Sequence, residues 1–227
     1  NLNTCVDSVN ALIADANMLA KAAVEGKLNT RADASKHQGD FQKIVVGVNQ
    51  TLDAVIGPLN VAAGYVDRIS KGDIPPKITD TYNGDFNTLK NNLNTCIEAT
   101  NQQATAAKAI SVGDLTVAVN VRSENDVMAK SLIDVTKAIN ALLVDANALS
   151  KAAVDGRLDV RAEGANHQGD YRKVVEGLNS VMVAVSTPVQ ELQEVLTAMQ
   201  GGDLTMPMRR NYEGTWDDLK SATNNML

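Results

Sequence analysis

The strongest constraint on this chain is that it repeats itself. The stretch Asn10–Pro58 aligns without a gap with Asn140–Pro188, and more than half of the aligned positions are identical. The match continues past Pro188, where Tyr212 corresponds to Tyr82. Self-similarity at a fixed period is typical of modular arrays, in which one supersecondary unit is stacked several times.

A shorter repeat lies inside the long one. A glycine followed two residues later by an apolar side chain recurs five times, at positions 26, 72, 113, 156 and 202. Each glycine precedes a stretch with β-branched residues or proline, then a polar turn and a helix start. Each unit is therefore predicted to be a helix, an extended connector and a second helix, in an all-α chain. The predicted units are residues 10–57, 58–98, 99–139, 140–187 and 188–227 (the last truncated at its C-terminal end), after the end of a preceding helix at residues 1–9.

The composition excludes several classes of protein. A net charge of -6 and a pI near 4.9 argue against nucleic acid as a partner, because phosphate binding needs a concentrated basic face. No run of about 18 apolar residues is present, so membrane insertion of this segment is not expected. The two cysteines form no disulfide framework and fit a reducing cytosol. Only two Phe, four Tyr and one Trp are available, which favours long helices with narrow apolar seams over a bulky globular core.

The predicted helices carry an apolar seam with coiled-coil spacing. Its residues alternate steps of four and three, which is a strict heptad pattern. A stripe this narrow needs partners along its length, and helices that run head to tail in one chain do not supply them. The pattern therefore predicts an elongated parallel homodimer of stacked four-helix coiled-coil bundles. The seam is Phe41, Val45, Val48, Leu52, Val55, Leu59, Ala62, Val66 and Ile69, and it recurs as Tyr171, Val175, Leu178, Met182, Val185, Val189, Leu192, Leu196 and Met199.

The junctions between units are predicted to differ. Pro58 and Pro188 lie inside the seam, and each is interpreted as the start of the next unit's first helix, entered with almost no linker. The seam across Pro58, from Phe41 to Ile69, is a whole number of heptads, whereas the seam from Phe86 to Ile110 is four positions shorter. The shorter junction breaks the seven-residue period and predicts a phase shift between neighbouring units.

The connectors are predicted to be fixed by a glycine and two apolar side chains. The glycine occupies the position after a helix end, which requires a positive φ, and the apolar residues fold back onto the bundle. Ala32 and Ala162 replace the second apolar residue in units one and four, so those connectors are expected to be held less firmly. Aspartates 40, 85 and 170 are expected to cap the following helices. With the two prolines, the predicted relay and packing residues are Gly26, Leu28, Gly72, Ile74, Ile78, Gly113, Leu115, Val119, Gly156, Leu158, Gly202, Leu204, Met208, Pro58 and Pro188.

Together these residues resemble the HAMP domain, the signal-relay module of bacterial chemoreceptors and sensor histidine kinases. The stretch from Pro58-Leu59 to Gly72-Asp73-Ile74 is similar to the family's first helix, which opens with Pro and closes with Gly-Asp-Leu. Phe41, Val48, Asn49 and Leu52 follow its second-helix pattern, and Asn94, Asn179 and Asn224 occupy the corresponding place in their units. The resemblance implies a tandem HAMP array of parallel four-helix bundles. Unit three is the most divergent, and the register of its second helix is left open.

Three candidate chemical sites compete with plain structural roles. His37 and His167 head identical His-Gln-Gly-Asp runs, where a metal site or pH switch with Asp40 or Asp170 is conceivable, but one His and one Asp are too few ligands. A solvated turn is the favoured interpretation. Cys5 and Cys96 are interpreted as small reduced core residues rather than redox sensors. A methylation site at Gln102-Gln103 is disfavoured because its upstream half fits poorly.

Two functions remain open from the sequence. The resemblance implies an intramolecular relay that converts a sensor's input into altered helix packing for a downstream kinase-control domain, in the cytoplasm and without a catalytic site or cofactor. The alternative is a rigid dimerising coiled-coil spacer that does not switch. Expected partners are a second copy of the chain and the flanking sensor and kinase-control domains. A ligand-binding helical bundle is disfavoured, because no convergent polar or aromatic site is visible.

Overall fold

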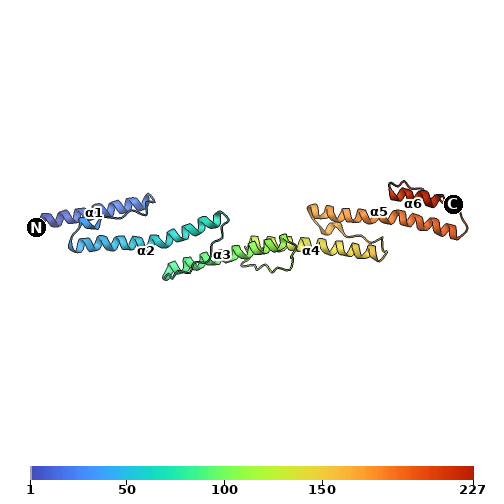
Figure 1. Cartoon of the computed structure of the whole chain (residues 1–227). Helices are drawn as coiled ribbons and strands as arrows, with labels where there is room; N and C mark the ends of the chain where they lie inside the picture. Colours follow the sequence, from blue (N-terminus) through green and yellow to red (C-terminus); the bar gives the residue numbers. More distant parts are fainter. Residues whose placement is uncertain (1) are drawn as a thin grey trace. The chain divides into compact units, whose positions relative to one another are not determined.

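The computed structural model describes residues 2–227, in which six α-helices and two short 3-10 helices occur and no strand is found (Figure 1). The all-α fold expected from the sequence is confirmed. The helices are α1 (Leu2–Val24), α2 (Gly39–Ser70), α3 (Gly84–Ser111), α4 (Val127–Val154), α5 (Gly169–Gln200) and α6 (Thr215–Asn224), and the 3-10 helices are η1 (Ala34–Lys36) and η2 (Gly164–Asn166).

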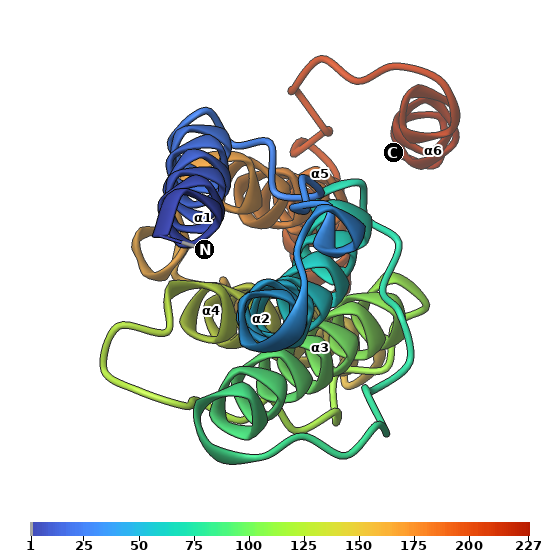
Figure 2. The same ribbon diagram turned by 90° about the vertical axis from the view of Figure 1, so that its left-hand side faces the viewer.

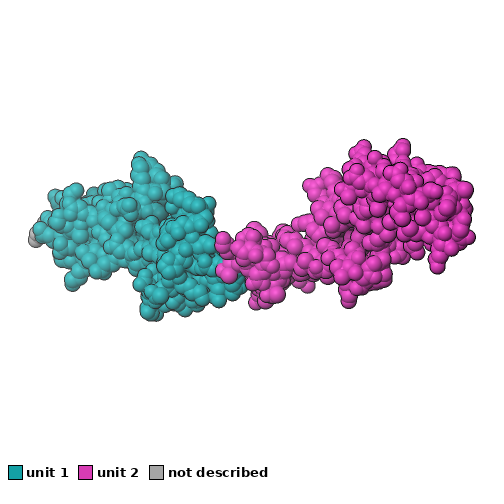
Figure 3. Space-filling model, turned by 45° about the vertical axis from the view of Figure 1, so that its right-hand side comes forward, with its two compact units in different colours: residues 1–104 teal, residues 105–227 magenta. Residues whose placement is uncertain are grey.

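Five connectors separate the six helices, and each begins beside one of the five repeated glycines. They are named the first (residues 25–38), second (71–83), third (112–126), fourth (155–168) and fifth (201–214) connectors. The chain divides within α3 into two compact parts, an N-terminal part of residues 1–104 and a C-terminal part of residues 105–227 (Figure 3).

Two of the helices run through a proline. Helices α2 and α5 have 32 residues each and contain Pro58 and Pro188, respectively. Proline lacks the amide that would donate to the preceding turn, yet both helices continue past it, so the predicted absence of a linker at these junctions is confirmed. Helix α3 has 28 residues and is shorter than α2 by four, which matches the four positions missing from its seam.

In the N-terminal part, helices α1 and α2 pack beside each other and are joined by the first connector (Figure 2). Ala22 of α1 and Val45 and Ile56 of α2 are buried. The second connector leads from α2 to α3, where Ile97 is almost fully buried, at 1% exposure.

In the C-terminal part, α5 packs against both α4 and α6. The fourth connector returns along α4, so that α5 starts beside α4 rather than beyond its end (Figure 1). The core contains Leu149, Val175, Met182, Val195 and Met208, all at 6% exposure or less.

The apolar seam is only partly buried within one chain. In α5, Val175 and Met182 of the seam are buried, but after Pro188 the buried residue is Val195, while Leu196 of the seam is 47% exposed. Met182 and Val195 are separated by about 3.6 helical turns, so they face nearly opposite sides of α5. The physical reason is that α5 is covered by the fourth connector before the proline and by the fifth connector after it.

Two smaller expectations need correction. Asp40 and Asp170 lie in the first turn of their helices but are not caps: the N-cap residues are Gln38 and Gln168, without side-chain cap bonds. The two aspartates instead pair with lysines one turn later, Asp40 with Lys43 at 2.9 Å and Asp170 with its counterpart at 2.6 Å. Both cysteines are exposed in the described chain rather than buried in a core.

Helix α2 also bears on the expected absence of a membrane span. Among the described helices, it is the one that is long and apolar enough to cross a membrane, with a mean hydropathy of 1.2 in its most apolar stretch. Only 11% of that stretch is buried within the chain. This criterion rests on length and composition alone, and the seam spacing of α2 is equally suited to a protein partner.

Candidate functional site: the connectors and the side chains that fix them

Each connector starts with the same helix-terminating turn. The glycines at 26, 72, 113, 156 and 202 have φ between 74° and 87°, as predicted for the position after a helix end. In the second connector, the amide of Gly72 donates to the carbonyl of Ile69 and the amide of Asp73 to that of Arg68. These two bonds form a Schellman motif, which satisfies the last carbonyls of a helix and reverses the chain direction.

In two connectors the residue after the glycine stabilises the turn further. The carboxylate of Asp114 accepts from the hydroxyl and the amide of Thr116, at 2.7 and 3.0 Å, and Asp203 does the same with Thr205. These hydrogen bonds favour the ionised carboxylate and lower the pKa of both aspartates.

An asparagine on the second helix fixes four of the connectors in the same way. The side-chain oxygen of Asn94 accepts from the amide of Ile78 at 2.7 Å, and its nitrogen donates to the carbonyl of Ile78 at 3.0 Å. The side-chain amide thus pairs with the backbone as a neighbouring strand would in a sheet. It satisfies both the N–H and the C=O of one extended residue. The same two bonds join Asn49 to Ala32, Asn179 to Ala162 and Asn224 to Met208.

The residue bound by the asparagine is the second of the two predicted apolar positions. Ile78 and Met208 are 6% and 1% exposed, as expected for side chains that fold back onto the helices. The first apolar position behaves differently: Leu204 is 53% and Leu28 is 41% exposed, while Ile74, Leu115 and Leu158 are half-buried. Leu204 is therefore not covered by the described residues of its own chain, and its burial against a dimeric bundle stays a prediction.

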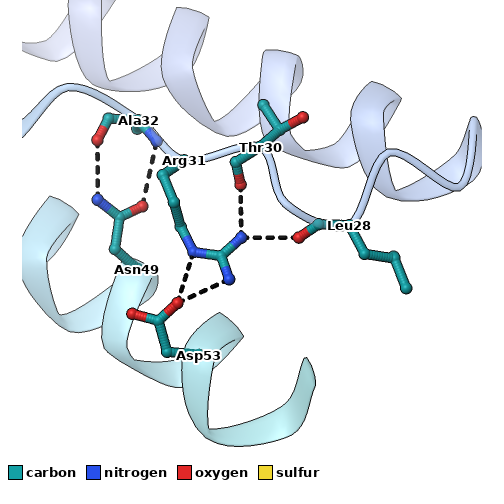
Figure 4. A network of polar contacts seen from close by, with 6 residues as sticks. All are labelled: Leu28, Thr30, Arg31, Ala32, Asn49 and Asp53. Atoms are coloured by element: carbon teal, nitrogen blue, oxygen red, sulfur yellow. Dashed lines mark hydrogen bonds and ion pairs between the residues drawn. The ribbon is translucent and has the colours of Figure 1, made fainter. Parts of the chain in front are cut away.

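The first connector has Ala32 at the second apolar position, and this small side chain makes little apolar contact. Polar bonds fix the connector instead. The guanidinium of Arg31 donates from Nε and Nη2 to Oδ1 of Asp53 on α2, at 2.9 and 2.7 Å (Figure 4). Its Nη1 also donates to the carbonyls of Leu28 and Thr30, both at 2.7 Å (Figure 4). Connectors with alanine were expected to be held less firmly because only apolar packing was considered. The hydrogen bonds of Arg31 were not part of that argument.

The two histidines are buried and not in a solvated turn. Nε2 of His37 lies 2.7 Å from Oδ2 of Asp15 on α1, and the His37 side chain is 2% exposed. Nε2 of His167 lies 2.6 Å from Oδ2 of Asp145 on α4, with the same 2% exposure. The favoured interpretation was wrong because the sequence run suggested Asp40 and Asp170 as partners, whereas the true partners are 22 residues upstream.

The fifth connector is fixed by a carboxylate on α5. Glu191 accepts from the amides of Arg209 and Arg210, at 2.8 and 3.2 Å, and from the hydroxyl of Tyr212 at 2.6 Å. Burial opposes the ionisation of Glu191, but these donors outweigh it and lower its pKa. Burial and the hydrogen bond to Glu191 raise the pKa of Tyr212 to about 12. The repeat equivalent of Glu191 is Val61, so the second connector has no such carboxylate.

The third connector is fixed by a different arrangement. The structure also shows where the second helix of unit three begins, which the sequence left open. Helix α4 begins at Val127, and Asp126 caps it by accepting from the amide of Ala129 at 3.2 Å. The same carboxylate, 3% exposed, pairs with Nε of Arg122 at 2.7 Å and accepts from the Arg122 amide. The hydrogen bonds from Arg122 hold the pKa of Asp126 well below its usual range. Val119 is half-buried here, without the asparagine found in the other units.

These side chains position the backbone of the connectors. Among the described residues no group of three or more His, Cys, Asp or Glu is close enough to hold a metal ion. A groove of about 1030 Å³ lies in the C-terminal part between α4 and the start of α5. Its lining includes the apolar side chains of Ala138, Leu142 and Val174.

The sequence matches the HAMP domain family model at residues 36–102 and 166–227. These two ranges cover more than half of the chain, and their starts occupy equivalent positions of the internal repeat, as Asn10 and Asn140 do. This chain belongs to the HAMP domain family. It is a tandem HAMP array, as the sequence pattern predicted.

One curated relative gives a further comparison. The chain is 30% identical over 76 residues to the methyl-accepting chemotaxis protein McpB of Pseudomonas aeruginosa. That alignment covers 34% of this chain and 11% of the relative, so the chain spans only a small part of the relative's length. No solved structure matches the chain. HAMP domains are non-catalytic signal-relay modules, and they occur in the cytoplasmic part of chemotaxis-type membrane receptors.

Proposed function

We propose that this array relays a conformational signal from a sensor to a kinase-control domain through changes in helix packing. The observation that carries the proposal is that α2 and α5 each run unbroken from one connector past a proline to the next. A rotation or displacement imposed at one end of such a helix acts on both of its connectors. Two sites are coupled when both bias one shared structural element, and a shared helix is such an element.

The relay is proposed to work as a parallel homodimer. In the single chain, Leu59 and Val66 of α2 are 43% and 55% exposed, and their repeat equivalents Val189 and Leu196 of α5 are 37% and 47% exposed. Each pair is spaced by one heptad, which is the spacing of a coiled-coil seam. A second copy of the same helices would bury these side chains and fill the open groove between α4 and α5. The same contact would cover the exposed apolar stretch of α2 without a membrane.

The flanking partners and the cellular location are part of the same proposal. A sensor and a kinase-control domain are proposed to adjoin the array in its native protein, with the array on the cytoplasmic side. The support for this is the family and the alignment to a chemotaxis protein.

A four-residue insertion in α3 tests the relay against the alternative of a rigid spacer. Inserted between Thr100 and Gln103, it gives the Phe86–Ile110 seam the same length as the seam across Pro58. Removing the phase offset should fix neighbouring units in one packing mode. The readout is the stimulus response of the native protein that carries the array. A seven-residue insertion at the same place is the matched control, because it adds length and preserves the helical phase.

The relay predicts loss of stimulus response with four inserted residues and retention with seven. If both insertions leave the response and the pattern of inter-chain cross-links unchanged, the array is a spacer. The dimer itself is tested by sedimentation equilibrium at micromolar concentration, which should give twice the chain mass. Mild oxidation should then join two chains through Cys5 or Cys96, and a compact monomer would contradict the proposed architecture.

A further inference from the structure

The two His–Asp pairs join elements that must move relative to each other if the packing of a unit changes. Asp15 and Asp145 lie in the first helices of units one and four. His37 and His167 lie two residues before the helices α2 and α5, which begin at Gly39 and Gly169. Each pair therefore bonds the side of one helix to the start of the next.

Because each pair is buried, breaking its hydrogen bond costs free energy. Both imidazoles have side chains at 2% exposure, whereas the carboxylates of Asp15 and Asp145 keep 23% and 28%. A buried imidazole that loses its partner has no water to replace it, and an unpaired buried polar group costs the full desolvation penalty. A hydrogen bond to a carboxylate is charge-assisted and stronger than one between two neutral groups.

The His–Asp pairs occur in units one and four. The chain has two histidines, and both take part. The second and fifth connectors contain no histidine. In the fifth, the hydroxyl of Tyr212 donates to Glu191 of α5 at the equivalent place, whereas the second connector has Val61 in place of that carboxylate. The same geometry occurs twice, at equivalent positions of the long repeat. This indicates a repeated structural feature rather than a peculiarity of one loop.

We propose that the His37–Asp15 and His167–Asp145 pairs fix the start of the second helix to the first helix in units one and four. In these units the two helices resist displacement along each other, because such a displacement breaks a buried charge-assisted hydrogen bond. Unit five has an equivalent bond, from the hydroxyl of Tyr212 to Glu191 of α5. Unit two has Val61 in place of the carboxylate and is the compliant unit. This inference does not depend on the relay, because a rigid spacer could contain the same pairs.

The bond is tested first without any substitution. In the ¹⁵N-labelled chain near pH 7, each of the two histidines should give a sharp, slowly exchanging Nε2 proton signal in nuclear magnetic resonance spectra. An imidazole proton that is bonded and buried exchanges slowly, whereas one in a solvated turn is lost to exchange with water. Absence of both signals, or protons on Nδ1 in place of Nε2, would overturn the proposal.

Substitutions then test what the bond does. His37→Phe keeps a buried ring and removes the donor, and Asp15→Ala removes the acceptor. Each should speed amide exchange at residues 31–38 by about tenfold or more, the effect of losing one hydrogen bond to a charged group. The double variant should be no faster than the single variants, since both remove the same bond. Residues 161–168, around His167, serve as an internal control and should not change.

Two further variants keep the test decisive if a substitution disturbs folding. Asp15→Asn keeps an oxygen acceptor for Nε2 and should retain most of the protection. Asp7→Ala removes an exposed carboxylate from the same helix and should leave exchange at residues 31–38 unchanged. Exchange that rises less than about twofold in His37→Phe, well below the loss of a charged hydrogen bond, would show that the pair does not fix the connector. Equal effects of Asp7→Ala and Asp15→Ala would show the same.

Discussion

The first and second connectors share a glycine turn and an asparagine clamp, yet they are fixed by different means. The second is fixed mainly by an apolar side chain, Ile78, which is 6% exposed. The first has Ala32 at that place and is fixed by Arg31 and His37, which bond to both neighbouring helices. The fourth connector resembles the first, with His167 bonded to α4, whereas the fifth combines a buried Met208 with the polar bonds of Glu191.

The difference teaches that one backbone arrangement can be stabilised by forces with different geometric demands. Apolar burial is non-directional, so an isoleucine tolerates small displacements of the helices that it touches. Charge-assisted hydrogen bonds require short donor–acceptor distances and good alignment, so the first connector permits less displacement before it loses its bonds. We therefore expect substitutions to act differently in the two classes of connector.

The largest expected effect is the loss of the apolar contact in the second connector. Ile78→Ala removes a buried side chain and should lower the free energy of unfolding by about 2–5 kcal/mol, measured by urea denaturation followed by circular dichroism. The matched substitution in the first connector, Ala32→Gly, should cost about 0.5–1 kcal/mol, mostly in backbone entropy. Similar costs at the two positions would contradict the division into apolar and polar connectors.

The pH dependence of the fifth connector should give a smaller effect. Tyr212 has a pKa raised to about 12 in the folded chain, above the value of about 10 in an unfolded one. Stability from this group is complete below pH 10 and is lost as the pH rises from 10 towards 12. The lowered pKa of Glu191 has the opposite sign: its contribution is present above the unfolded value and is lost as the pH falls through the folded one.

Ultraviolet absorbance after rapid mixing to alkaline pH measures tyrosine ionisation directly. One of the four tyrosines should ionise near pH 12, and Tyr212→Phe should remove that step. Glu191→Val introduces the residue found at the equivalent position 61 and should move the step towards pH 10. If the late step survives Tyr212→Phe, another tyrosine is responsible, and the fifth connector is not fixed as described.

The sequence was sufficient for the helices and connectors of the single chain, because these depend on local and periodic features. The glycine turns, the helices that run through Pro58 and Pro188, and the burial of Ile78 and Met208 all follow from spacing within one element or one turn. Because of the long repeat, each of these patterns occurs at least twice in the sequence. The difference in length between α2 and α3 was visible for the same reason.

The polar contacts were missed because their partners are far apart in sequence. His37 and Asp15 are separated by 22 residues across a chain reversal, so the neighbouring Asp40 was the partner that the sequence run suggested. A signal was present: the repeat keeps Asp15 and Asp145 as well as both histidines. The burial of Leu204 depends on a bundle of two chains, so it stays a prediction for the dimer.

The smallest expected effect concerns the ion pair between Arg31 and Asp53. The fourth connector shows what its loss leaves behind: Arg161 still donates to the carbonyls of Leu158 and Val160, although Val183 stands in place of the aspartate. Asp53→Val should therefore lower the free energy of unfolding by no more than about 1 kcal/mol, because the Asp53 side chain is 67% exposed and exposed ion pairs contribute little. The effect should shrink at high salt. A loss above about 2 kcal/mol, beyond the range of exposed pairs, would show that Asp53, rather than the His37–Asp15 pair, fixes the first connector.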